Sequence, residues 1–255
     1  MSDDSGIRQI TISEQIADHL LALISEQNLQ PDDQLPSEME LARTFKVSRP
    51  AVREATNALA RQGIIVKAAG KRPVVRALSQ KSFANLVTHG LVTRQTSLIE
   101  VLEARSGLEM MAAELAVDRI TEEGSALLRE VTGQLKKHVG DDDEFSIHDE
   151  RLHRIIVDTS RNSLIRNLLD GIGFAVAQSY GAGLKSVYEA DAWKQVLRVH
   201  LDIADAIIRK DKDAARIAMN AHFVFAIART RKYLSRHRNS ERIANDGLGA
   251  GKRVL

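Results

Sequence analysis

An aspartate and three histidines have the residue types and the spacing to bind a divalent metal ion. Asp149 and His153 are four residues apart, so on a helix they project from the same face. His200 and His222 are each eleven residues from Asp211. One straight helix would hold these two imidazoles roughly 33 Å apart, whereas a turn at Asp211 would bring them to the same height. Three imidazoles and a carboxylate suit Zn, Ni, Co or Mn, so the pattern predicts one metal site from all four side chains.

The other histidines have weaker claims as ligands. Any single histidine is as easily explained as an ordinary core or surface residue. His148 is next to Asp149, but neighbours on a helix point about 100° apart, which excludes it from the same ligand set. Three more, His89, His138 and His237, have no partner at ligand spacing, and His19 is expected at the surface of the first helix.

Arg105 is the candidate for binding an anion. Its apolar neighbours Leu102, Leu108 and Ala112 place it toward the inside or the edge of a helical domain. A guanidinium in a cavity holds a carboxylate through two parallel hydrogen bonds. An ion pair with Glu109, four residues along the same helix, explains Arg105 equally well.

A second chemistry is indicated by the basic stretch from Arg43 to Arg76. It contains nine Lys and Arg residues and one acid, Glu54, so nine minus one gives +8, against +2 for the whole chain. The pattern from Leu35 to Arg76 predicts two helices, opened by Ser37 and Ser48, and then two strands around Ala69 to Lys71. On the second helix Arg49, Arg53 and Asn57 share one face. A helix-turn-helix with a basic wing predicts binding to double-stranded DNA.

The composition limits the remaining possibilities. A chain of 255 residues is long enough for two domains. It has no cysteine, hence no disulfide or thiolate ligand, and its aromatic content of 4% argues against a stacking platform for single-stranded nucleic acid. No apolar run or signal-peptide pattern suggests a membrane, so we expect a cytoplasmic protein.

The four prolines all lie in the first third of the chain, and the remainder has helical periodicity. Capping residues and breaks predict six or seven helices after the linker at 77–81, with Ser97-x-x-Glu100 opening a long one. We therefore expect a mainly α protein. Residues 1–77 would form the winged helix-turn-helix domain, residues 78–236 an antiparallel helical bundle, and residues 237–255 a disordered tail.

The first domain resembles the winged-helix domain of the GntR family of bacterial regulators. The resemblance rests on Leu35-Pro36-Ser37-Glu38, Glu40-Leu41-Ala42, Val47-Ser48-Arg49 and Val52-Arg53-Glu54-Ala55. It implies DNA contacts from Ser48, Arg49, Arg53, Gly70 and Lys71. Met39 stands where the family often has an arginine that helps to read DNA, and Gly70-Lys71-Arg72-Pro73 replaces the commoner wing tip.

Residues 97–234 resemble the all-helical effector domain of the FadR-like branch of that family. The matching features are Glu103-x-Arg105-x-x-Leu108-Glu109, Asp149-x-x-x-His153 and the late His200 and His222. The resemblance implies a metal held by the four residues named above. It also implies that Arg105 helps to bind an acidic effector.

These features favour a transcriptional regulator that is not an enzyme. We expect a homodimer that acts as a repressor and is released from a palindromic operator by a small organic acid. Two alternatives stay open. The Asp/His site could activate water in a hydrolase, although no spare acid or base stands at catalytic spacing, or the ion itself could be the signal in a dedicated metal sensor.

Overall fold

The computed structural model describes residues 10–180 and 190–249 of the 255. The chain separates into two compact units between Ser82 and Phe83, and each unit has its own hydrophobic core. The sequence placed this boundary at residue 77. Within the described residues, no helix is both long enough and apolar enough to cross a membrane.

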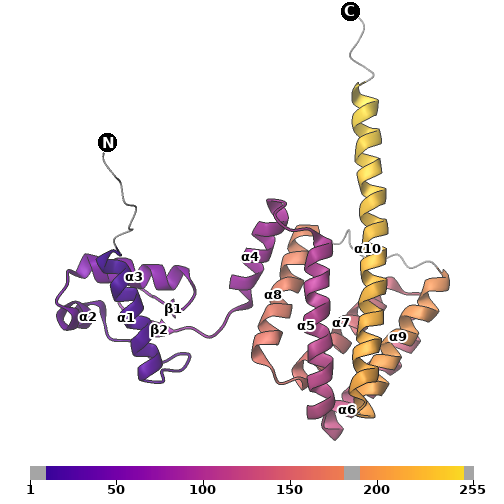
Figure 1. The fold of residues 1–255 in the computed structure, drawn as a ribbon, viewed down its shortest axis with the longest axis horizontal. Coiled ribbons are helices and arrows are strands. Elements are labelled where there is room, and N and C mark those ends of the chain that lie inside the picture. Colours follow the sequence, from indigo (N-terminus) through magenta and orange to yellow (C-terminus); the bar gives the residue numbers. More distant parts are fainter. Residues whose placement is uncertain (1–9, 181–189, 250–255) are drawn as a thin grey trace, which may run out of the picture. The chain divides into compact units, whose positions relative to one another are not determined.

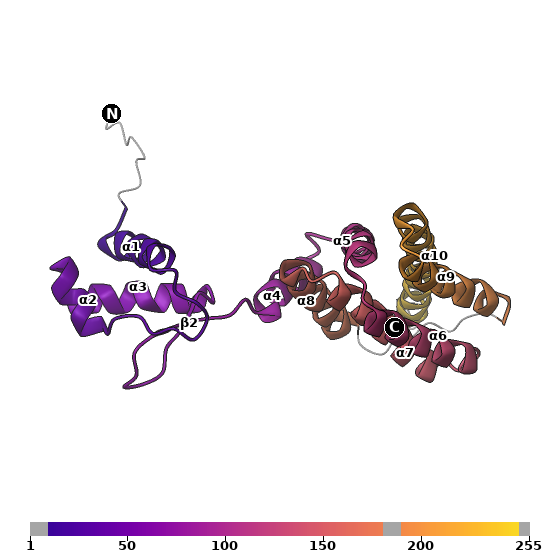
Figure 2. The ribbon, with the colours of Figure 1, turned by 90° about the horizontal axis from the view of Figure 1, so that it is seen from below.

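The first unit is a three-helix domain with a two-stranded wing (Figure 1). Its elements are α1 (Ile12–Glu26), α2 (Glu38–Phe45), α3 (Arg49–Arg61), β1 (Ile65–Val66) and β2 (Val74–Val75). The strands are antiparallel, and Ile65 pairs with Val75. Figure 2 shows α1 on one side of α3, and the two helices pack together with Leu20, Val52 and Leu59 buried in one core.

Local capping explains where α2 and α3 begin. Ser37 and Glu40 form a capping box at the start of α2, and the Ser48 side chain accepts a hydrogen bond from the Ala51 N–H at the start of α3. Lys46 ends α2 in the left-handed conformation, with φ of 54°. These caps set the tight turn that presents α3 as the second helix of a helix-turn-helix.

The second unit is helical throughout its described residues. Its elements are α4 (Gln80–Val92), α5 (Leu98–Arg119), α6 (Glu122–Lys137), α7 (Asp142–Thr159), α8 (Ser163–Tyr180), α9 (Ala190–Ile208) and α10 (Lys212–Gly249). In Figure 1 the long helices α5 and α10 run side by side, and α9 packs against α10. One core, which includes Ala113, Leu128, Phe145, Ile156 and Ile203, joins α5, α6, α7, α9 and α10.

Two boundaries differ from the sequence interpretation. The helix α4 already begins at Gln80, within the segment expected to be a linker. The helix α10 continues to Gly249, although a disordered tail was expected from residue 237. This continuation has a local reason, because no proline interrupts it and its glycines come only at the end. Residues 250–255 lie outside the described part of the chain.

Candidate metal centre and DNA-binding face

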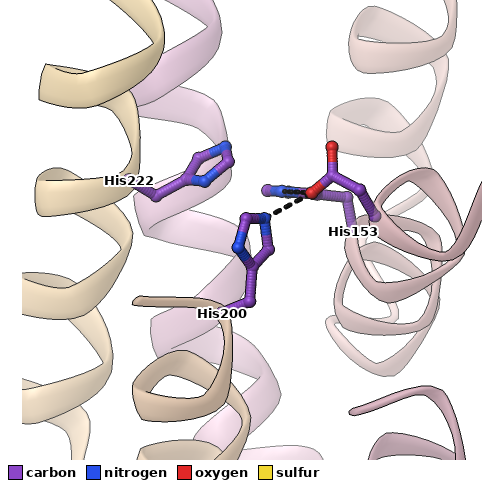
Figure 3. A group of neighbouring side chains, drawn as sticks. His153, His200 and His222 are labelled. Carbon is purple, nitrogen blue, oxygen red and sulfur yellow. Dashed lines mark hydrogen bonds and ion pairs between the residues drawn. The ribbon is translucent and has the colours of Figure 1, made fainter. Parts of the chain in front are cut away.

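The structure brings together the four residues that the sequence proposed as ligands. Asp149 and His153 come from α7, His200 from α9 and His222 from α10. One potential ligand atom from each lies within 4.8 Å of the others. Figure 3 shows the three imidazoles directed toward a common point. The chain does reverse at Lys210 and Asp211, between α9 and α10, and this reversal places His200 beside His222 with 4.7 Å between ring centroids.

Contacts on the outer side of the His200 and His153 rings determine which nitrogen of each faces this point. The Nδ1–H of His200 donates to the Val196 carbonyl at 2.6 Å, which leaves Nε2 toward Asp149. The Nδ1–H of His153 donates to Glu109 Oε2 at 2.5 Å. A metal-bound histidine usually donates its second N–H in this way to a carbonyl or a carboxylate. The rings of His200 and His153 are therefore oriented as a metal site requires.

One buried atom tests whether a metal fits. His153 Nε2 has no hydrogen-bond partner, although it is buried and lies 3.5 Å from Asp149 Oδ1. Buried polar atoms in proteins are almost always hydrogen-bonded, and an unpaired one costs free energy. A cation between His153, His200, His222 and the Asp149 carboxylate would satisfy this nitrogen. The residues present fit a divalent metal ion.

The charges of this centre are strongly coupled. Burial opposes the charged form of His153, but Glu109 and Asp149 outweigh it and raise its pKa to about 10. Burial likewise opposes the Glu109 carboxylate, yet His153 and Arg105 lower its pKa to about 2. The pKa of His222 falls well below its usual value because of burial and the neighbouring His153 and His200. Without a metal, His153 is therefore protonated at neutral pH, and its positive charge opposes the binding of a cation.

Arg105 extends the centre by one residue. Its Nε donates to Glu109 Oε1 at 2.9 Å, and the other oxygen of Glu109 accepts from His153. The intrahelical pair with Glu109 considered from the sequence is therefore present. The Arg105 side chain keeps 30% of its exposure, and its guanidinium lies 5.9 Å from the ring centre of Phe223.

One cavity among the described residues lies away from the four ligand candidates. It measures about 230 Å³ and opens at the junction of α5, α6 and α7. Arg119, Leu127, Ile155, Asp158 and Arg161 belong to its lining. It contains none of the four ligand candidates and not Arg105, so its size does not identify the functional site.

The residues proposed to contact DNA lie on the surface of the first unit. Ser48 caps α3, and the side chains of Arg49 and Arg53 are exposed on this helix. Gly70 and Lys71 are exposed between the two strands, and Gly70 has φ of 72°, a conformation that glycine adopts without strain. The geometry therefore presents all five at the surface of one small domain.

Two acids just before the basic stretch reduce its effective charge. Glu38 Oε1 accepts from Lys67 Nζ at 2.7 Å, and Glu40 Oε1 accepts from Arg72 Nη2 at 2.7 Å. Counting from Glu38 to Arg76, nine basic residues minus three acids give +6 rather than +8. The same pairs tie the wing to α2, a role that the charge count did not indicate.

Comparison with known proteins agrees with this division. Residues 12–75 match the family described as bacterial regulatory proteins, gntR family, and residues 100–225 match the FCD domain. The chain is 30% identical over 223 residues to the "HTH-type transcriptional repressor NanR" of Enterobacter sp. (strain 638), covering 83% of this chain and 82% of that protein.

The chain belongs to the GntR family. It is a DNA-binding transcriptional regulator with an N-terminal helix-turn-helix domain and a C-terminal helical FCD domain. It is also 29% identical over 222 residues to the "Putative L-lactate dehydrogenase operon regulatory protein" of Escherichia coli (strain K12), with 84% of each chain covered. Among solved structures, "Streptococcus agalactiae GntR" matches with a TM-score of 0.54 and 27% identity, over 85% of this chain and 99% of that one.

Sequence reasoning missed two features of this GntR-family chain. Glu109 was seen only as a partner of Arg105, although a carboxylate among apolar helix residues could have indicated a buried ionic contact. His138 and His148 were set aside, yet the structure places them near each other and near Glu144. The physical reason is the turn between α6 and α7, which brings the end of α6 beside the start of α7. Residue spacing along a single helix cannot reveal such a contact.

Proposed function

We propose that this GntR-family regulator is a metal-containing repressor that a small organic acid releases from its operator. The observation that carries the proposal is the centre of four ligand candidates, with its unpartnered His153 Nε2, next to the Arg105–Glu109 pair. The FadR-like resemblance of the helical unit supports the same reading. This function needs three parts: a metal, a site for the acid and a symmetric DNA-binding surface.

The metal would be held by Asp149, His153, His200 and His222. When bound, a Zn, Ni, Co or Mn ion supplies a Lewis acid that can accept a carboxylate oxygen. The protein's contribution is orientation. Val196 and Glu109 fix the outer nitrogens of His200 and His153, and burial of both rings keeps water from competing for these contacts.

Arg105 is the residue proposed to bind the acid. Its Nε donates to Glu109, and no carboxylate of the described residues pairs with its two terminal amino groups. These groups can therefore bind a second anion. Glu109 links it to His153 and hence to the ligand set. A carboxylate bound by Arg105 would therefore be sensed at the metal centre through one shared side chain.

DNA binding is assigned to Ser48, Arg49, Arg53, Gly70 and Lys71. All five are exposed, and they lie at the start of α3, on its surface and in the wing. One winged helix reads few base pairs, whereas a homodimer reads two half-sites of a palindrome. Light scattering that gives a monomer at micromolar concentration, with and without DNA, would refute the homodimer.

The names of two relatives agree with repression and with an organic acid. One is called a repressor, and the other a putative regulatory protein of an L-lactate dehydrogenase operon. L-lactate and other small hydroxy acids are therefore the first effectors to test. They match the chemistry of a guanidinium beside a Lewis-acidic ion.

The test combines operator binding with removal of the metal. An operator is first selected from random DNA, and its binding is then titrated with a panel of organic acids, with and without chelator. We expect one class of acid to release DNA and to raise the melting temperature, and chelator to abolish both effects. If metal alone releases the operator, the chain is a metal sensor. If no acid acts on the metal-loaded protein, the proposal fails.

A further inference from the structure

A second group of metal-ligand side chains lies where α6 turns into α7. It consists of His138, the residue that ends α6, with Glu144 and His148 from the first two turns of α7. One potential ligand atom of each lies within 4.8 Å of the others. The rings of His138 and His148 are 5.2 Å apart between centroids and tilted by 43°. No residue of this group belongs to the Asp149 centre.

Backbone geometry explains how these residues meet. Gly140 has φ of 95°, and the Asp141 N–H donates to the His138 carbonyl at 3.1 Å, so a short turn reverses the chain. Asp141 then caps α7 by accepting from the Glu144 N–H at 3.2 Å. Glu144 and His148 are four residues apart and share one helix face. The turn thus places the end of α6 over this face.

Buried atoms without a hydrogen-bond partner also occur near this turn. Among the described residues, four buried side-chain atoms have no hydrogen-bond partner: Asp142 Oδ1, His148 Nδ1, His153 Nε2 and Ser179 Oγ. His153 belongs to the first centre. Two of the other three lie within residues 142–148. His148 Nε2 is also 4.0 Å from Glu144 Oε2, too far for a hydrogen bond, so His148 has no good partner on either nitrogen.

The charge around the turn suits a cation. Residues 141–144 are four consecutive acids, which offset the partial positive charge at the start of α7. The last carbonyls of α6, beside His138, carry partial negative charge. Lys136 and Lys137 act in the opposite sense, but both are exposed to solvent. Two imidazoles and one carboxylate form a ligand set that Zn²⁺ accepts together with water.

We infer that His138, Glu144 and His148 form a second divalent-metal site, of the class that binds Zn²⁺, separate from the Asp149 centre. An ion there would join the end of α6 to the start of α7. The chain would then bind two metal ions, one between α7, α9 and α10 and one at the α6–α7 turn. This inference does not depend on the organic-acid response or on DNA binding.

The experiment counts Zn²⁺ ions in the full-length protein. Metal-free protein is dialysed against free Zn²⁺ buffered at about 1 μM, a level that fills nearly all of a site whose dissociation constant is about tenfold lower or less. Bound metal is measured by elemental analysis. The variants are His138→Ala and Glu144→Gln, with His200→Ala to remove the first centre. His89→Ala is the matched control, because His89 is an exposed histidine on α4.

We expect about two ions in the parent and in His89→Ala, and about one in His138→Ala, in Glu144→Gln and in His200→Ala. Added Zn²⁺ should raise the melting temperature of His200→Ala but not that of the double variant with His138→Ala. The inference is overturned if the parent binds about one ion, or if both turn variants bind as many ions as the parent. Glu144→Gln keeps the size of the side chain, so a folding defect in His138→Ala would not hide the result.

Discussion

Glu109 is not a ligand candidate, but it orients one of the candidates, His153. It accepts from His153 Nδ1 at 2.5 Å and from Arg105 Nε at 2.9 Å. Glu109→Gln should weaken metal binding by roughly 10–100-fold, because the ring of His153 loses its charged acceptor and becomes a poorer donor to the metal. Competition with a chromophoric zinc chelator measures the change.

The same helix offers a control for this prediction. Glu103 is an exposed carboxylate on α5 that lies 3.3 Å from Arg231. Glu103→Gln removes an equal charge from the same element and should leave metal affinity within about twofold, as expected of an exposed ion pair. Equal loss of affinity in both variants would mean that the total charge of α5 matters, and not the contact with His153.

The protonation of His153 predicts an unusual pH dependence. Burial lowers the pKa of His153, but Glu109 and Asp149 outweigh it and raise this pKa to about 10. His153 is therefore protonated in the metal-free protein at neutral pH, and a metal must displace that proton. His222, whose pKa is lowered by burial and its histidine neighbours, is already neutral. Metal affinity should therefore rise about tenfold per pH unit between pH 7 and 9. A histidine at its ordinary pKa of about 6.5 would give a plateau there.

Stability of the metal-free protein should change in the opposite direction. A raised folded-state pKa stabilises the fold fully below the unfolded value near 6.5, and the contribution disappears as pH rises toward 10. The melting temperature without metal should thus fall over this range, while that with saturating metal should fall less.

The proton that His153 loses when the metal binds can be counted by calorimetric titration of the protein with metal, in buffers of different ionisation enthalpy. Release of none at pH 7.5 contradicts the assignment.

At the scale of elements, Glu38 ties the wing to the helix-turn-helix. Its Oε1 accepts from Lys67 Nζ at 2.7 Å and from Thr56 Oγ1 at 3.2 Å, and Lys67 also donates to Asn57. Glu38→Ala leaves half-buried donors without their charged acceptor and should cost about 1–2 kcal/mol. Urea unfolding of the full chain, followed at the transition of the first unit, measures it.

A second acid of the same domain is the control for Glu38. Glu54 is exposed on α3, so Glu54→Ala should change stability by no more than about 0.5 kcal/mol. If both variants unfold at the same urea concentration, the contacts of Glu38 contribute nothing to the domain. Such a result would also remove the reason to regard the wing as held by α2.

Substitutions on α3 and in the wing should weaken DNA binding in different ways. Arg53→Ala should cost about 1–3 kcal/mol of specific operator binding if Arg53 reaches a base edge. Lys71→Ala should weaken binding to all sequences and reduce the salt slope by about one unit if Lys71 contacts a phosphate. Binding measured against salt on specific and random DNA separates the two. Unchanged binding in both variants would place the DNA-binding face elsewhere.

Local signals in the sequence were enough for most elements. The capping boxes at Ser37 and Ser97 mark the starts of α2 and α5, and Ser48 marks that of α3. A turn was predicted near Asp211, and because His200 and His222 are equidistant from it, the convergence of the four ligand candidates was predicted as well. These features depend on residues within one or two turns, or on a single reversal of the chain.

Contacts between distant residues could not be read in the same way. Glu38 and Lys67 are 29 residues apart, and Glu109 and His153 are 44 apart. Each pair meets only because two elements pack, and many other acids and bases in the sequence have the same local surroundings. His138 was set aside for the same reason, since its approach to His148 needs the left-handed Gly140.

At the scale of the whole molecule, the two units predict separable defects. The residues proposed to bind DNA lie in residues 1–82, and those proposed to bind the metal and the acid lie in the unit that follows. A ligand shifts a conformational equilibrium only if it binds the two states differently. An altered second unit can therefore lose its response while the first unit still binds DNA.

Two substitutions test this separation. His200→Ala should remove the metal of the Asp149 centre and the organic-acid response together, while operator binding without acid persists. Arg105→Ala should abolish the acid response and retain most of the metal, because Arg105 pairs with Glu109 and forms no hydrogen bond or ion pair with the four described ligand candidates. Elemental analysis and operator binding titrated with the active acid give both readouts. If His200→Ala binds as many ions as the parent, the ligand set of the Asp149 centre is wrong. If it loses this metal and still responds to the acid, the ion is structural and the coupling through Glu109 does not exist.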